Sequence, residues 1–254
     1  MPGPKTWTHE LKRRAGSLWV VKMLATTGGI AIFFYGYFWV MRHPLSAAAV
    51  MPETWIDDLV LFSPQSFPLY VSLWVYIGLA PALAEDGREL AAWGAASFAM
   101  TVIGLGLFMA LPTKVPDFAI DWSRYPSLEF LKRADVSGNA CPSLHAAFSV
   151  FTAVVLHRQL TAIRAPRTLL ACNALWCLGI VYSAMATRQH VALDVIAGSL
   201  LAGAASIAYV GAGRMPGRTN ASISPPLVRH ASRAQVQPAE TVREPGSQPE
   251  TGRR

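Results

Sequence analysis

The sequence predicts an all-α fold: a polytopic membrane protein built as a six-transmembrane-helix bundle, with a disordered C-terminal tail. Three observations lead to this prediction. Of the 254 residues, 52% are hydrophobic and only 15% are charged, whereas a soluble domain carries about 25% charged residues. The apolar residues gather in runs of helical length, separated by short polar or basic stretches. After residue 212, Pro, Ser, Gln, Arg, Glu and Thr dominate, and such a segment cannot bury a core.

The expected organisation is therefore a basic cytoplasmic N-terminus over 1–17, a membrane domain over 18–212 and a disordered tail over 213–254. The N-terminal segment suits a short helix on the inner membrane surface, and a frayed tail explains its charge equally well. Residues 18–41 are predicted as the first spanning helix. A signal peptide is the competing interpretation, but its apolar core is usually about 7–15 residues long, and this run is longer.

Two further spans precede the most polar part of the chain. Residues 55–62 have a helical apolar spacing with acids on one side, so we expect them to lie along the outer surface. Residues 67–85 are predicted as the second spanning helix. Residues 90–112, rich in Ala and Gly, are predicted as the third and suit close helix packing.

The last three spans are expected over 143–157, 168–186 and 190–210, and a short basic loop over 158–167 joins the first two. The span at 143–157 is short for a bilayer, which needs about 20 residues, so its ends must lie in protein or at the interface. Six spans place both termini on one side, where three of the four polar segments are basic. By the positive-inside rule that side is cytoplasmic, and the protein is expected in the inner (plasma) membrane.

Charge and cysteine content argue against several other classes. The net charge of +7 is concentrated at the chain ends and in one loop, and no basic stripe is interleaved with aromatic residues, so nucleic acid is not an expected partner. The three cysteines show no metal-ligand spacing. Cys172 and Cys177 are expected to be small buried apolar residues. The expected partner is the lipid bilayer, and the sequence leaves the oligomeric state open.

Two polar clusters enclose residues 141–194 and dominate the expected chemistry. The first ends at His145 and the second runs from Thr187 to Asp194, with mostly apolar residues between them. Two helices that cross the membrane and return would bring His145 next to His190. Both clusters belong to connections opposite the basic loops, so we expect a site on the periplasmic or extracellular side.

His190 and Asp194 form the expected catalytic pair. Their i,i+4 spacing puts both on one face of a helix. A carboxylate there can accept the Nδ1 proton and leave Nε2 free as a nucleophile or base. The alternative is a polar pair that only satisfies itself, which is a weak explanation in lipid, where ionisable groups are usually functional.

The helix start at Ser143 is the expected anion site. Ser143 stands at the N-cap position after Pro142, and the free N–H groups and the helix dipole favour a phosphate there. The Ser143 hydroxyl can donate to a phosphate oxygen or serve only as a cap. His145, in the first turn, is a candidate acid or only an interfacial anchor.

Arg188 and Lys114 are the candidate phosphate-binding cations. A guanidinium binds phosphate through two parallel hydrogen bonds and stays charged; an interfacial arginine is the alternative. Lys114 follows the third span on the same outer side. Further basic residues of that connection are explained equally well by a solvated loop: Arg124, Lys132 and Arg133. Because arginine and a helix N-terminus supply positive charge, we expect no metal and no other cofactor.

These residues together resemble the type-2 phosphatidic acid phosphatase superfamily, which includes lipid phosphate phosphatases and vanadium haloperoxidases. Pro142-Ser143-x-His145 is similar to its P-S-x-H second motif, and His190-x-x-x-Asp194 to the end of its third. The resemblance covers roughly residues 60–210. It implies a six-helix core with the site at the outer helix ends, with His190 as nucleophile, Asp194 as its orienting partner and His145 as acid.

Two of the family's motifs are incomplete here. The third-motif arginine, six residues before the histidine, is replaced by Ala184, and Arg188 is the candidate substitute. The Arg-Pro of the first motif is replaced by Asp121 and Trp122.

The stretch Pro112-Thr113-Lys114-Val115-Pro116 is similar instead to the P-T-x-x-P of a branch that contains inositol phosphorylceramide synthase-like proteins. Lys114 or Arg124 is then the candidate replacement for the missing first-motif residues.

The expected function is hydrolysis of a lipid phosphate ester or pyrophosphate through a phosphohistidine. Two alternatives stay open: an inositol phosphorylceramide synthase-like head-group phosphotransferase, and a non-catalytic membrane protein or small transporter of the same fold. A haloperoxidase would hold vanadate in the same pocket, but six apolar spans favour a lipid substrate.

Overall fold

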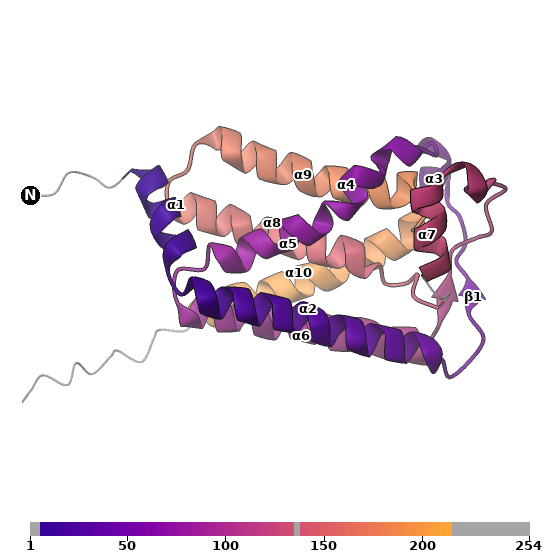
Figure 1. Cartoon of the computed structure of the whole chain (residues 1–254), viewed down its shortest axis with the longest axis horizontal. Helices are drawn as coiled ribbons and strands as arrows, with labels where there is room; N and C mark the ends of the chain where they lie inside the picture. Colours follow the sequence, from indigo (N-terminus) through magenta and orange to yellow (C-terminus); the bar gives the residue numbers. More distant parts are fainter. Residues whose placement is uncertain (1–5, 135–137, 215–254) are drawn as a thin grey trace, which may run out of the picture. The chain divides into compact units, whose positions relative to one another are not determined.

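The computed structural model describes residues 6–134 and 138–214, and these residues form a mostly helical unit. The predicted tail, apart from its first two residues, lies outside the described part of the chain. The helices that run side by side in Figure 1 are α2 (Trp19–Arg42), α4 (Phe67–Val71), α5 (Leu73–Ala82), α6 (Gly87–Ala110), α8 (Leu144–Ala162), α9 (Arg167–Ala186) and α10 (Ala192–Arg214). Their bounds lie within a few residues of the predicted spans, except that α8 extends five residues further.

Four of these helices are long and apolar enough to cross a membrane: α2, α6, α9 and, over Ala192–Gly211, α10. The helix α8 packs against α5, α9 and α10, and it carries polar side chains that are buried within the protein. Ser149, Thr152 and Gln159 are each at most 3% exposed. Gln159 Nε2 donates to the Ala80 carbonyl at 2.9 Å and to a Glu89 carboxylate oxygen at 3.0 Å. Because protein surrounds α8, its sequence can be less apolar than that of a lipid-facing helix.

The predicted second span, 67–85, is divided into α4 and α5 at Ser72. The Ser72 hydroxyl donates to the Leu69 carbonyl at 2.6 Å and accepts from Trp176 Nε1 of α9 at 2.9 Å. A side chain that bonds back to the preceding turn competes with the regular helix. Pro81 then stands in the last turn of α5, which ends at Ala82.

The N-terminal segment forms a bound helix, α1 (Trp7–Gly16), so the frayed-tail alternative is wrong for these residues. Arg14 is buried and pairs with Glu85 at 2.9 Å. Lys22 Nζ donates to the carbonyls of Arg14 at 2.6 Å and Ala82 at 3.0 Å. A hydrogen bond from Arg13 holds the pKa of Glu10 at about 2. These contacts attach α1 to the ends of α2 and α5.

Short elements gather at the end of the bundle opposite α1 (Figure 1). They are β1 (Ala49–Val50), α3 (Trp55–Leu59), η1 (Pro64–Ser66), β2 (Thr113–Lys114), η2 (Trp122–Arg124) and α7 (Pro126–Ala134). The strands β1 and β2 pair in parallel, and Thr113 also bridges to Asn139. The expectation that 55–62 is a surface helix with its acids on one side is wrong in two respects. The helix stops at Leu59, and Asp57 is buried while Asp58 is exposed, because Asp57 bonds other parts of the chain.

Candidate functional site

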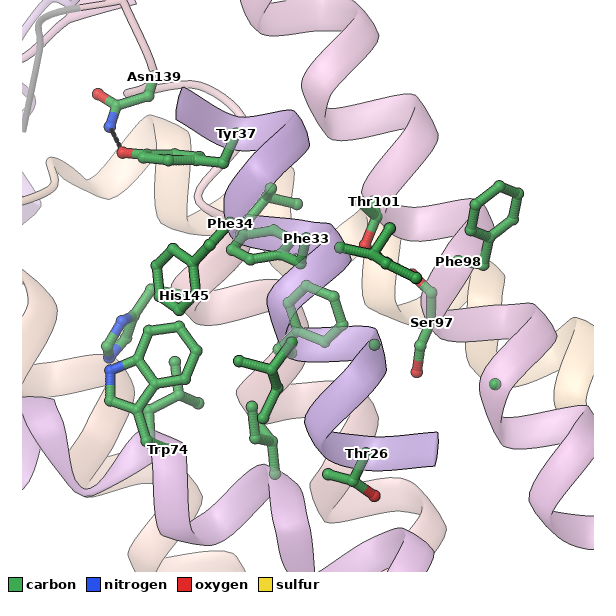
Figure 2. A pocket seen from close by; sticks show the side chains of 18 of the residues that line it. Thr26, Phe33, Phe34, Tyr37, Trp74, Ser97, Phe98, Thr101, Asn139 and His145 are labelled. Carbon is green, nitrogen blue, oxygen red and sulfur yellow. Dashed lines mark hydrogen bonds between the residues drawn. The ribbon is translucent and has the colours of Figure 1, made fainter. Parts of the chain in front are cut away.

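A cavity of about 560 Å³ lies between α2, α5, α6 and α8, and both predicted histidines line it. Figure 2 shows His145 beside Trp74, with Tyr37 and Asn139 above and Thr26 at the far end. Asn139 donates a hydrogen bond to the Tyr37 hydroxyl. The larger apolar and aromatic lining residues are Ile30, Ile32, Phe33, Phe34, Phe38, Leu73, Trp74, Ile77, Leu90, Trp93, Phe98, Phe108, Leu131, Leu144 and Phe148. The cavity thus combines a long apolar wall with two imidazoles.

The turn before His190 is built by the C-terminus of α9. Arg188 N donates to the Met185 carbonyl at 2.9 Å, and Gln189 N donates to the Ala184 carbonyl at 3.1 Å. This pair of bonds is the Schellman arrangement, in which the C′ residue is left-handed and usually glycine. Here it is Arg188, with φ of 56°, a conformation that costs a non-glycine residue about 1–2 kcal/mol. The sharp reversal sets His190 two residues before α10, which begins at Ala192 and not at residue 190 as expected.

His190 and Asp194 form the predicted pair. His190 Nδ1 lies 3.1 Å from Asp194 Oδ2, and the Asp194 side chain is fully buried. The His190 side chain is 11% exposed, and the residue lines the cavity. The carboxylate fixes Nδ1, so the other ring nitrogen, Nε2, is the one available to a ligand.

The starts of α8 and α10 are bonded directly to each other. Ser143 N donates to the Asp194 carbonyl at 2.9 Å, and the Ser143 hydroxyl accepts from Ala146 N at 3.1 Å, as an N-cap does. The contact is possible because residue 198 is glycine: a Cβ there would overlap the Ser143 carbonyl oxygen. Because no side chain separates the two helices, the start of α8, which carries the predicted acid His145, lies next to the start of α10, which follows the predicted nucleophile His190.

His145 lies in the first turn of α8 and lines the cavity. Its ring stacks on Tyr70, with centroids 3.9 Å apart and planes within 5°. Its Nε2 is buried and has no hydrogen-bond partner among the residues that the structure describes. A buried imidazole nitrogen without a partner needs an explanation, and a ligand group in the cavity would provide one. Ser143, in contrast, uses its hydroxyl as a cap and is fully buried.

Arg188 has its guanidinium outside the set of groups that line the cavity. The guanidinium lies 4.9 Å from the centre of the Phe118 ring, and Nη1 is 3.5 Å from the Asp57 carbonyl. Ala184, at the position of the family's third-motif arginine, is fully buried on α9. The Arg188 guanidinium therefore lies against Phe118 and the Asp57 carbonyl and not in the cavity.

Lys114 is also not among the residues that line the cavity. Its ammonium pairs with Asp117 at 3.5 Å and is about one-third exposed. Thr113 has the closer connection to the site, because its hydroxyl accepts from Cys141 N at 2.8 Å and its carbonyl accepts from Ala140 N at 3.0 Å. The Pro112–Pro116 stretch thus holds the segment that leads into Ser143.

Among the polar and aromatic residues of the cavity, the sequence did not identify Tyr37, Tyr70, Asn139 and Gln189 as part of the site. Tyr37 and Tyr70 read as interfacial aromatic residues of apolar runs, and nothing in the spacing distinguishes them from membrane anchors. Gln189 stands between Arg188 and His190, so its proximity to the second motif is a signal that could have identified it.

No group of three His, Cys, Asp or Glu side chains is arranged to hold a metal ion within residues 6–134 and 138–214. The N-terminus of α8 lies against Asp194, whose backbone carbonyl accepts a hydrogen bond from Ser143 N. Partial positive charge at a helix N-terminus favours an anion, so the arrangement suits a phosphate group held near two imidazoles.

Comparison with known proteins gives one match. A model of the PAP2 superfamily matches residues 89–215, which is half of the chain and includes all but the first two residues of α6 and the whole of α8, α9 and α10. No curated protein and no solved structure matches the chain.

Proposed function

Because the chain belongs to the PAP2 superfamily, whose members are typically phosphatases, we propose that it is a membrane enzyme that hydrolyses a lipid phosphate ester or pyrophosphate. The reaction proceeds through a phosphohistidine. One observation carries the proposal: the cavity that contains His145 and His190 continues as an apolar wall along α2, α5 and α6. A phosphate at the histidines would leave the lipid tail against that wall.

The proposed first step is phosphoryl transfer to His190. Nε2 attacks phosphorus with its lone pair, and the bond from phosphorus to the leaving oxygen breaks. The Asp194 carboxylate, 3.1 Å from Nδ1, stabilises the positive charge that develops on the ring. His145, protonated on Nε2 in the substrate complex, gives that proton to the leaving oxygen. The products are the lipid alcohol and the phosphohistidine.

The proposed second step releases the phosphate. His145, now neutral, takes a proton from a water molecule, whose oxygen attacks the phosphohistidine. The nitrogen–phosphorus bond breaks, inorganic phosphate leaves, and both histidines return to their starting states. Backbone N–H groups at the start of α8 are suited to hold the phosphoryl oxygens. We propose that the side chains of Arg188 and Lys114 move toward the bound phosphate and add positive charge there.

The proposed membrane arrangement has six spans: α2, α4–α5, α6, α8, α9 and α10. The enclosed helix α8 is included because its polar side chains face protein. The connection between α8 and α9 lies at the same end of the bundle as α1, and the starts of α8 and α10 lie at the other end (Figure 1). Because His145 is in the first turn of α8 and His190 precedes α10 by two residues, this arrangement supports cytoplasmic termini and a periplasmic or extracellular site.

Head-group transfer to an alcohol, as in inositol phosphorylceramide synthase-like proteins, is the second candidate. It is favoured by the P-T-x-x-P stretch at Pro112–Pro116, because Thr113 of that stretch holds the segment before Ser143. The steps are the same except that an alcohol replaces water and a phosphodiester lipid is formed.

The function is tested with the purified full chain in detergent and a panel of lipid phosphates and pyrophosphates. Hydrolysis predicts release of inorganic phosphate in an amount equal to the lipid consumed. If phosphate release is unchanged when inositol is added, the result supports the hydrolase. If the lipid is instead converted into a new phosphodiester lipid, the result supports the transferase. Absence of both products over the whole panel contradicts the enzyme proposal.

Filling the far end of the cavity is expected to change the preference for tail length. Leu144 approaches Gly104, and Gly94, ten residues earlier on α6, lies roughly 15 Å further along the helix. Gly94 lines the cavity, and a Cβ there meets nothing within 4 Å. Gly94→Leu is therefore expected to raise KM for a long-chain lipid phosphate about tenfold or more, because each methylene that can no longer be buried contributes roughly 0.8 kcal/mol. KM for a short-chain lipid phosphate should stay within about twofold of the wild-type value.

The matched control is Gly106→Leu, on the same helix but outside the cavity, where a Cβ also meets nothing within 4 Å. It should leave both KM values unchanged. Equal effects of Gly94→Leu on long and short substrates would mean that the lipid tail lies elsewhere.

A further inference from the structure

Asp57 is a buried carboxylate in α3, outside the segment that matches the superfamily. It is 2% exposed. Its Oδ1 accepts a hydrogen bond from Ala192 N at 2.7 Å. Its Oδ2 accepts from Thr54 N at 2.8 Å and from the Thr54 hydroxyl at 2.9 Å. Burial of a carboxylate is costly unless donors satisfy it, and here three donors do so.

The bond to Ala192 lies between the two residues of the proposed catalytic pair, His190 and Asp194. Ala192 is the first residue of α10, so its N–H is one of the donors that a helix start leaves without an intrahelical partner. His190 precedes it by two residues, and Asp194 follows it by two. A negative charge at a helix N-terminus also interacts favourably with the dipole. Asp57 therefore caps α10 from another part of the chain, midway between the two members of the catalytic pair.

Residues 56–63, which include Asp57, also contact the turn between α9 and α10. The Asp57 carbonyl is the group that Arg188 Nη1 approaches, and Ser63 N donates to the Ala186 carbonyl at 2.8 Å. The side chains of Ile56 and Val60 pack against a small buried cluster: Ala146, Met185, Ala192 and Val195. Residues 56–63 thus contact the end of α9, the turn and the start of α10.

We propose that Asp57 is a positioning residue of the active site, which fixes the start of α10 so that His190 and Asp194 face the phosphate. The inference rests on the proposed function for its kinetic consequence and on the hydrogen bonds alone for its structural one. Asp57 and Thr54 do not line the cavity. The residue therefore acts on the turnover step and leaves the binding of the lipid tail unchanged.

The kinetic test compares Asp57→Ala, Asp57→Asn and Asp58→Ala in the full chain, with one lipid phosphate and phosphate detection. Displacement of a reacting group by about 1 Å can cost about 10²-fold, so Asp57→Ala should lower kcat 10- to 100-fold while KM stays within about threefold. Asp57→Asn keeps an oxygen for Ala192 N and should recover most of kcat. Asp58→Ala, on the exposed side of the same helix, should match the wild type. A merely structural role would lower the amount of folded protein and leave kcat per folded molecule unchanged, and that result overturns the proposal.

Amide hydrogen exchange separates this inference from the proposed function. In Asp57→Ala, peptides that cover 187–195 should exchange faster than in the wild type and in Asp58→Ala, while peptides from the middle of α6 should not change. If the wild type has no activity but this difference is seen, the proposed function is wrong and the structural part of the inference stands. Unchanged exchange over 187–195 overturns the inference whatever the activity.

Discussion

Replacement of His190 by alanine is expected to abolish turnover, with kcat at least about a thousandfold lower. The nucleophile and its activating partner act as one unit, so removal of either member of such a pair removes most of the rate enhancement. In the structure, Asp194 fixes Nδ1 of His190 and His190 lines the cavity, so Nε2 is the ring nitrogen available to a ligand. The measurement is phosphate release from a lipid phosphate, with protein folding checked by thermal unfolding in detergent.

A second readout tests the role of His190 directly. Incubation with a lipid carrying labelled phosphate, stopped with base, should leave label on the wild type and none on His190→Ala. The control is His157→Ala, an exposed histidine of α8, which should retain both label and turnover. Persistent labelling of His190→Ala would assign the nucleophile to another residue.

Gly198→Ala is expected to lower kcat by about 10²-fold. The new Cβ overlaps the Ser143 carbonyl oxygen and lies 3.0 Å from its carbon, and a backbone contact cannot be relieved by a change of rotamer. The starts of α8 and α10 must then separate, and a displacement of about 1 Å in a reacting group costs about that factor. Overpacking should also lower the free energy of unfolding by about 1–3 kcal/mol.

The matched control is Gly203→Ala on the same helix, where a Cβ meets nothing within 4 Å. It should keep wild-type kcat and thermal stability. If Gly198→Ala behaves like this control, direct contact between the two helix starts is not needed for turnover.

The helices that are long and apolar enough to cross a membrane could be predicted because lipid imposes one strong rule: backbone polar groups must be satisfied within a helix, and side chains that face lipid must be apolar. That rule identifies α2, α6, α9 and α10 by hydropathy. It identifies α8 poorly, because Thr152 and Gln159 face other helices and not lipid. The division at Ser72 was also missed, since a single serine in an apolar run does not indicate whether its hydroxyl bonds to the preceding turn.

The candidate site could be predicted in part for a different reason. His190 and Asp194 are close in the sequence, so a contact between them was expected, although His190 lies two residues before α10 and not on that helix as predicted. The meeting of Ser143 with Asp194 needs a hairpin of known geometry, and the glycine that allows it, Gly198, is one of many in apolar runs. Asp57 could not be predicted, because its partner Ala192 is distant in the chain and contributes only a backbone N–H.

In the proposed arrangement of six spans, the enclosed position of α8 has a consequence for how the chain enters the membrane. Because α8 carries the hydroxyls of Ser149 and Thr152 and the amide of Gln159, it has little tendency to move by itself from the translocation machinery into lipid. It should be inserted together with α9, joined to it by the short loop before Arg167, as one hairpin. Glycosylation-site mapping of chains truncated after residue 163 and after residue 190 would then show stable insertion of α8 only in the longer chain.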